Sequence, residues 1–108
     1  MPDLRDNDVH DNSAAVAQAE EYLKNISESN GYAVMLRTIW DAYKLACKQV
    51  KGKADMLNLS RSVEVDLYNF ITEARMMGEG ELASNATRLA KQVNTNIWKY
   101  GRGGGASF

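Results

Sequence analysis

The chain has 108 residues, of which 44% are hydrophobic and 25% charged, and its 13 basic and 14 acidic residues leave a formal net charge of −1. This length suits one domain with one core, and the composition is typical of globular rather than disordered proteins. A net charge near zero excludes a bulk attraction to nucleic acid or acidic lipid, although local patches can still attract either. Because no stretch is apolar enough for a signal peptide or a membrane span, we expect a cytoplasmic protein, or a virion-associated one if a phage encodes it.

Helix boundaries in this chain depend on glycine, because the only proline is Pro2 and no internal proline can break a helix. Helix-sized segments are separated by Gly31, Gly52, Gly78, Gly80 and Gly101. Glycine adopts the left-handed conformation that closes many helices, so we expect C-terminal caps at these positions. Between them, apolar residues recur at spacings of three and four. This pattern predicts an all-α fold, an antiparallel bundle or array of about four amphipathic helices with short Gly-containing loops.

The first predicted helix is short and rich in alanine, and Asn12 or Ser13 is its expected N-cap. Its apolar positions are Val16, Ala19, Leu23 and Ile26. The second helix has the most regular pattern, with apolar residues alternating at spacings of four and three along one face. These residues are Tyr32, Leu36, Ile39, Tyr43, Ala46 and Val50.

The third helix has two alternative starting points. Its apolar series supports a start near residue 54, whereas Ser60 or Ser62 could cap a helix that begins near residue 61. That series is Met56, Leu59, Val63, Leu67, Phe70, Ala74 and Met77. The fourth helix contains Leu82, Ala86, Leu89, Val93, Ile97 and Tyr100, and we expect it to end at Gly101. The predicted organisation is an acidic flexible leader (1–12), a helical domain (13–100) and a Gly-rich flexible tail (101–108).

Net charge alternates in sign along the chain. Residues 1–30 contain two basic and seven acidic residues, and residues 31–53 contain five and one. Residues 54–81 contain two and six, and residues 82–108 contain four and none. An antiparallel bundle would therefore place opposite charges on neighbouring helices and like charges on the diagonals. Either the helices complement one another within a monomer, or the acidic front and basic back drive head-to-tail association between copies.

Two basic faces are candidate interaction surfaces. On the second helix and just after it lie Arg37, Trp40, Lys44 and Lys51, and on the fourth Arg88, Lys91, Lys99 and Arg102. Cations that neutralise phosphates beside a ring that stacks on bases are typical of nucleic-acid binding. Alternatively, Trp40 packs at the edge of the core with lysine stems along it, and the late cations complement the helix dipole. Terminal Phe108 could anchor in a partner's pocket, or belong to a frayed end.

Nothing in the sequence supports catalysis or a metal site. The only histidine, His10, lies in the leader and the only thiol, Cys47, lies within a helix, so a Cys-His pair or a Ser-His-Asp triad would require an improbable fold-back. The series Asp6, Asp8, His10 fails as a calcium loop because Asp11 stands where glycine is needed. We expect no enzyme activity, metal, cofactor or small-molecule substrate.

These observations favour a non-enzymatic helical interaction or assembly protein. We expect it to associate with itself or to dock into a larger protein complex, and its size and helicity would suit a small component of a virion or a secretion apparatus. The alternative is a small nucleic-acid-binding protein that uses the basic faces of its second and fourth helices.

Overall fold

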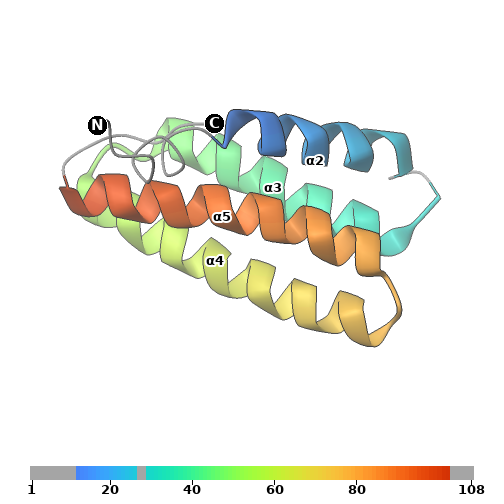
Figure 1. Ribbon diagram of the computed structural model, residues 1–108. Coiled ribbons are helices and arrows are strands. Elements are labelled where there is room, and N and C mark those ends of the chain that lie inside the picture. Colours follow the sequence, from blue (N-terminus) through green and yellow to red (C-terminus); the bar gives the residue numbers. More distant parts are fainter. Residues whose placement is uncertain (1–11, 27–28, 103–108) are drawn as a thin grey trace, which may run out of the picture.

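The computed structural model describes residues 12–26 and 29–102, in which every regular element is an α-helix (Figure 1). The helices are α2 (Ser13–Ile26), α3 (Gly31–Gln49), α4 (Lys53–Met76) and α5 (Gly80–Arg102). Successive helices run antiparallel and are joined by short connections (Figure 1). The predicted all-α bundle is therefore confirmed. Helices α3, α4 and α5 begin and end within three residues of the glycines that divide the chain, whereas α2 ends five residues before Gly31.

Each helix of the bundle packs mainly against two others, and α3 and α5 also contact each other across the core. Helix α2 packs against α3 and α5, and α4 packs against α3 and, most extensively, against α5. Helices α2 and α4 thus lie on one diagonal and α3 and α5 on the other. The helices themselves carry formal charges of −1, +2, −1 and +3 in chain order, so like charges lie on the diagonals as the sequence predicts. These charges are smaller than those of the whole segments because many charged residues lie outside the helices.

The glycines mark helix boundaries, but mostly not in the way the sequence suggests. Only Gly78, among the described glycines, has a positive φ, of 76°. It follows the C-cap Met77, and the N–H groups of Gly78 and Glu79 donate to the carbonyls of Arg75 and Ala74, which is a Schellman motif.

The other described glycines correct the expectation of C-terminal caps. Gly31 and Gly80 are the first residues of α3 and α5, and Gly52 is the N-cap of α4. Gly101 lies inside the last turn of α5, which continues to Arg102. At a helix start glycine needs no positive φ, so these positions are conformationally ordinary.

Helix α3 begins with a side-chain cap. The amide oxygen of Asn30 accepts hydrogen bonds from the backbone N–H groups of Tyr32 and Ala33, at 2.9 and 3.3 Å. Its amide nitrogen donates to both carboxylate oxygens of Glu79, at 3.3 Å each. Asn30 therefore caps α3 and also ties it to the α4–α5 connection.

The two alternatives for the third helix are resolved by α4, which runs without a break from Lys53. Ser60 caps nothing, because it lies in the helix interior and is fully buried. Its hydroxyl shares a 2.8 Å hydrogen bond with the Tyr43 hydroxyl.

The hydrophobic core contains most of the apolar positions predicted for α2, α4 and α5. Its largest fully buried apolar side chains are Leu23, Leu36, Trp40, Tyr43, Leu67, Leu82, Leu89 and Val93. The prediction is least accurate on α3, where Ala33, Trp40 and Cys47 are buried while Tyr32 and Ile39 are only half-buried. The buried face of α3 is therefore rotated from the predicted one.

A line of polar side chains crosses the core. The amide of Asn96 donates to the Tyr43 hydroxyl at 3.0 Å, and Gln92 donates to Asn96 at 2.9 Å. With the bond to Ser60, this network joins α3, α4 and α5. Buried polar groups that satisfy one another in this way favour one register of the helices over its alternatives.

Candidate functional site

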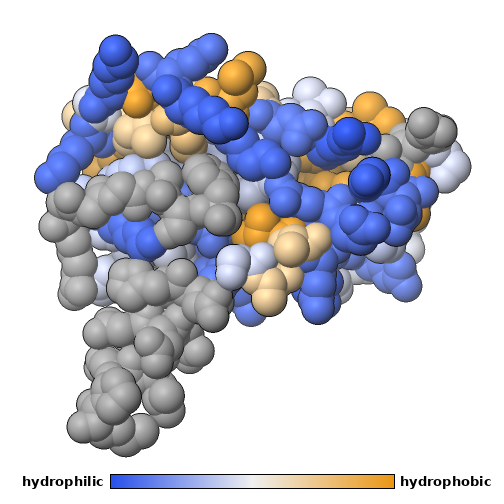
Figure 2. Space-filling model, turned by 90° about the horizontal axis from the view of Figure 1, so that it is seen from above, coloured by the Kyte–Doolittle hydropathy of each residue, from blue (hydrophilic) through white to orange (hydrophobic). Residues whose placement is uncertain are grey.

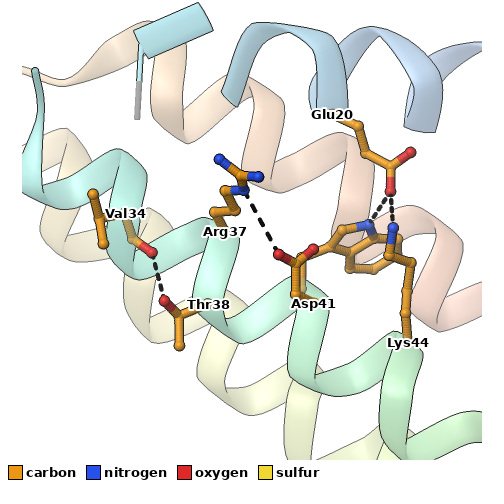
Figure 3. A network of polar contacts seen from close by, with 7 residues as sticks. Glu20, Val34, Arg37, Thr38, Asp41 and Lys44 are labelled. Atoms are coloured by element: carbon orange, nitrogen blue, oxygen red, sulfur yellow. Dashed lines mark hydrogen bonds and ion pairs between the residues drawn. The ribbon is translucent and has the colours of Figure 1, made fainter. Parts of the chain in front are cut away.

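The predicted basic face of α3 lies against α2, where one carboxylate oxygen of Glu20 accepts two hydrogen bonds (Figure 3). The indole N–H of Trp40 donates to it at 2.8 Å, and the ammonium group of Lys44 at 2.6 Å. Lys44 and Glu20 also form an ion pair between the two helices. The opposite charges of α2 and α3 thus meet directly at this point.

Trp40 does not offer a stacking surface. Only 1% of the residue is exposed, and its ring packs on Tyr43 at a centroid distance of 5.7 Å. The position agrees with the alternative in which Trp40 packs in the core, with its N–H reaching a polar partner at the edge. The nucleic-acid interpretation of α3 therefore lacks an exposed ring at this position.

The ionisation of Glu20 reflects these contacts. Partial burial would by itself raise the pKa of the carboxyl group, but the hydrogen bonds from Lys44 and Trp40 and the attraction of the Lys44 charge lower it below its ordinary value. Glu20 is therefore a stable anion at neutral pH.

Beside this contact lies a cleft of about 250 Å³ between α2 and α3. Its lining residues are Glu20, Leu23, Lys24, Arg37, Trp40, Asp41 and Lys44. Arg37 and Asp41 form an exposed ion pair along α3 with an N–O distance of 3.6 Å (Figure 3). Positive and negative groups alternate around the cleft, so it has no uniform charge that would select an anion or a cation.

The candidate residues of α5 are dispersed. Arg88 is half-buried and donates to Asn85 at 3.0 Å, at the edge of a polar groove of about 420 Å³ between α2 and α5. Lys91 is exposed and Lys99 is half-buried. Arg102 is the last residue of the helix.

Two candidates lie outside the helices. Lys51 is exposed in the connection between α3 and α4. Phe108 lies outside the described residues, as do His10 and the leader up to residue 11.

The structure does not gather the two basic faces on one surface. Because α3 and α5 lie on a diagonal, Arg37 and Lys44 border one side of α2, and Arg88 borders the other. Cations of both helices therefore flank the acidic helix α2, which is the intramolecular complementarity that the charge pattern allows.

The Cys47 thiol and the Tyr43 phenol are buried and protonated. Burial raises the pKa of Cys47 and raises that of Tyr43 to about 12, so neither group is ionised at neutral pH, and the thiolate, which is the nucleophilic form of cysteine, is disfavoured. Within the described ranges, no group of three or more His, Cys, Asp or Glu side chains could hold a metal ion.

A different surface, which the apolar spacing used to predict the core does not indicate, lies on the side of α3 that faces away from the core. Val34, Met35 and Leu45 are 49%, 45% and 58% exposed. Other large apolar side chains that are about half exposed or more are Val65, Tyr68, Met76, Met77 and Trp98. Seen from above, apolar patches interrupt an otherwise hydrophilic surface (Figure 2). On α3, the exposed apolar residues correspond to a second apolar spacing in the sequence, out of phase with the spacing of the core residues.

No family model, curated protein or solved structure matches the chain. None of the helices in the described part of the chain is long and apolar enough to cross a membrane.

Proposed function

We propose that this protein is a non-enzymatic helical interaction protein that associates with itself or docks into a larger protein assembly. The observation that carries the proposal is the exposed apolar surface of α3, where Val34, Met35 and Leu45 lie on one face of the helix. Single exposed apolar residues are common on protein surfaces. Several exposed apolar residues along one helix are more typical of a binding surface, because a partner that covers them removes apolar area from water, which is favourable.

The test is the solution mass of the chain, measured by light scattering over a concentration series. Self-association predicts a mass that rises above the 12.0 kDa of one chain as concentration increases. A variant that lacks residues 101–108 shows whether the tail contributes. A constant monomer mass, together with no protein partner recovered by affinity capture with the purified chain, would contradict the proposal.

Nucleic-acid binding is a second candidate, and α5 supports it better than α3. Lys91 and Trp98 are both exposed and are seven residues apart, which places them on one face of the helix. A cation beside an aromatic ring can contact a phosphate and a base. Binding of single-stranded DNA or RNA at low salt, lost in Trp98→Ala and retained in Trp40→Phe, would support it. No gel shift even at low salt would dismiss it.

A further inference from the structure

The outer face of α3 carries an uncharged stripe with the spacing of a helix–helix contact. Its residues are Gly31, Met35, Thr38, Ala42, Leu45 and Gln49, and all are exposed. They follow one another at intervals of four, three, four, three and four, which is the heptad spacing of helices that pack against other helices. The Thr38 hydroxyl donates to the Val34 carbonyl at 2.8 Å. Covering Thr38 would therefore leave no hydroxyl without a partner.

We propose that α3 of a second copy of the chain covers this stripe, packed antiparallel about a two-fold axis near residue 40. This inference rests on the proposed function and names its partner. In this register Met35 opposes Leu45 of the second copy, and Thr38 opposes Ala42 of the second copy. Large side chains then meet near the ends, and small ones meet at the centre, where the helices approach most closely. The same surface serves both copies, as a two-fold dimer requires.

The charges at the two ends of the bundle favour an antiparallel orientation of the second copy. The end that holds the α3–α4 connection carries, among described side chains, Lys48, Lys51, Lys53 and Lys99 against Asp55. The opposite end carries Lys24 and Arg75 against Glu73, Glu79 and Glu81. Antiparallel packing places the basic end of each copy beside the acidic end of the other. Parallel packing would place the two basic ends together, which is unfavourable.

The size of the stripe determines how strongly the two copies are expected to associate. Helix α3 has 19 residues, so it is about 28 Å long and about 10 Å wide. This footprint is well below the roughly 800 Å² per partner of stable complexes. The dimer should therefore be weak and should form at micromolar or higher concentrations.

Thiol cross-linking tests the partner and its direction. Gly31→Cys and Gln49→Cys are placed at opposite ends of the stripe, and a Cβ at Gly31 meets no atom within 4 Å. A short bis-maleimide should link an equimolar mixture of the two variants into a dimer of about 24 kDa, twice the 12.0 kDa chain. Either variant alone should not be linked, because its thiols lie 18 residues, or about 27 Å, apart along the helices. The wild-type chain, whose only thiol is buried, and Asn69→Cys on α4 are the controls.

Each outcome decides a separate point. Cross-linking of each variant alone, at a higher yield than in the mixture, would show parallel packing and overturn the inference. A dimer by light scattering with no cross-link in the mixture would also overturn it, while the proposed self-association would stand. A monomer at every concentration would overturn both the inference and self-association, and docking into a larger assembly would then be decided by affinity capture.

A disruptive variant gives an independent readout. Leu45→Glu should raise the dimer Kd about tenfold or more, because it removes a large apolar contact and introduces two carboxylates into the interface. Val65→Glu on α4 makes a matched change at a similarly exposed site, 56% against 58%, and should leave the Kd unchanged. Equal effects of the two variants, or no effect of Leu45→Glu, would count against the α3 interface. Circular dichroism of both confirms that they remain folded.

Discussion

Tyr43 and Tyr100 are both buried tyrosines, 1% and 5% exposed, but their hydroxyl groups have different surroundings. The Tyr43 hydroxyl joins Ser60 and Asn96 in the polar network of the core. The Tyr100 hydroxyl is buried without a hydrogen-bond partner in the described part of the chain, and the nearby Cys47 thiol is only a weak acceptor. The same chemical group therefore stabilises the fold at one position and not at the other.

This contrast predicts opposite results for the same substitution. Tyr43→Phe should lower the free energy of unfolding by about 1–3 kcal/mol, because it leaves the Ser60 and Asn96 groups buried without their partner. Tyr100→Phe should be neutral or slightly stabilising, because it removes an unpaired hydroxyl. Urea unfolding at neutral pH measures both. Equal losses of stability in the two variants would contradict this account of the network.

Glu20 predicts a dependence of stability on pH. Its pKa is lower in the folded chain than its ordinary value of 4.5, so its contribution is present above that value and is lost as pH falls through the folded pKa. Glu20→Gln should be less stable than wild type at neutral pH by about 1 kcal/mol or less, since the ion pair is partly exposed. The difference should shrink between about pH 7 and about pH 3.

Glu21→Gln is the control for this measurement, because Glu21 is exposed on α2 and does not line the α2–α3 cleft. Unfolding in urea at several pH values compares the three chains. A constant difference between wild type and Glu20→Gln across this range would argue against the ion pair with Lys44.

At the scale of whole helices, their boundaries show how far local sequence signals extend. The Asn30 cap and the left-handed Gly78 are local features, and residue types at these positions suffice to mark a start and an end. The start of α4 is different, because Ser60 resembles a cap in the sequence. Its partner Tyr43 is 17 residues away, and no local pattern reveals that contact.

The two glycines of the α4–α5 connection predict a second matched comparison. Gly78→Ala should cost about 1–2 kcal/mol, because alanine is strained at a φ of 76°. Gly80→Ala should be neutral or stabilise by up to about 1 kcal/mol, because a Cβ there meets no atom within 4 Å and φ is not left-handed. Thermal unfolding followed by circular dichroism compares them. If Gly80→Ala proves less stable than Gly78→Ala, the Schellman motif at Gly78 is not formed in solution.

At the scale of the whole molecule, the described side chains give the two ends of the bundle different charges along its long axis. An antiparallel dimer would place opposite charges side by side at both ends, at distances that salt screens. We therefore expect association to weaken as NaCl rises from about 0.05 M to about 0.5 M. Sedimentation velocity measures the dimer fraction at each salt concentration. Association that strengthens with salt would instead indicate an apolar contact without an electrostatic contribution.

The spacing of apolar residues is sufficient to predict four helices, their order and most of the core of α2, α4 and α5. Most apolar residues of those three helices fall on one face, so their periodicity favours one orientation. Helix α3 has apolar residues on nearly every side, from Leu36 and Trp40 in the core to Met35 and Leu45 outside. Periodicity alone cannot choose among such faces, and the packing of α2, α4 and α5 against α3 does. The candidate interface is the side of α3 that this packing leaves uncovered, which is why it emerges only when the helices are assembled.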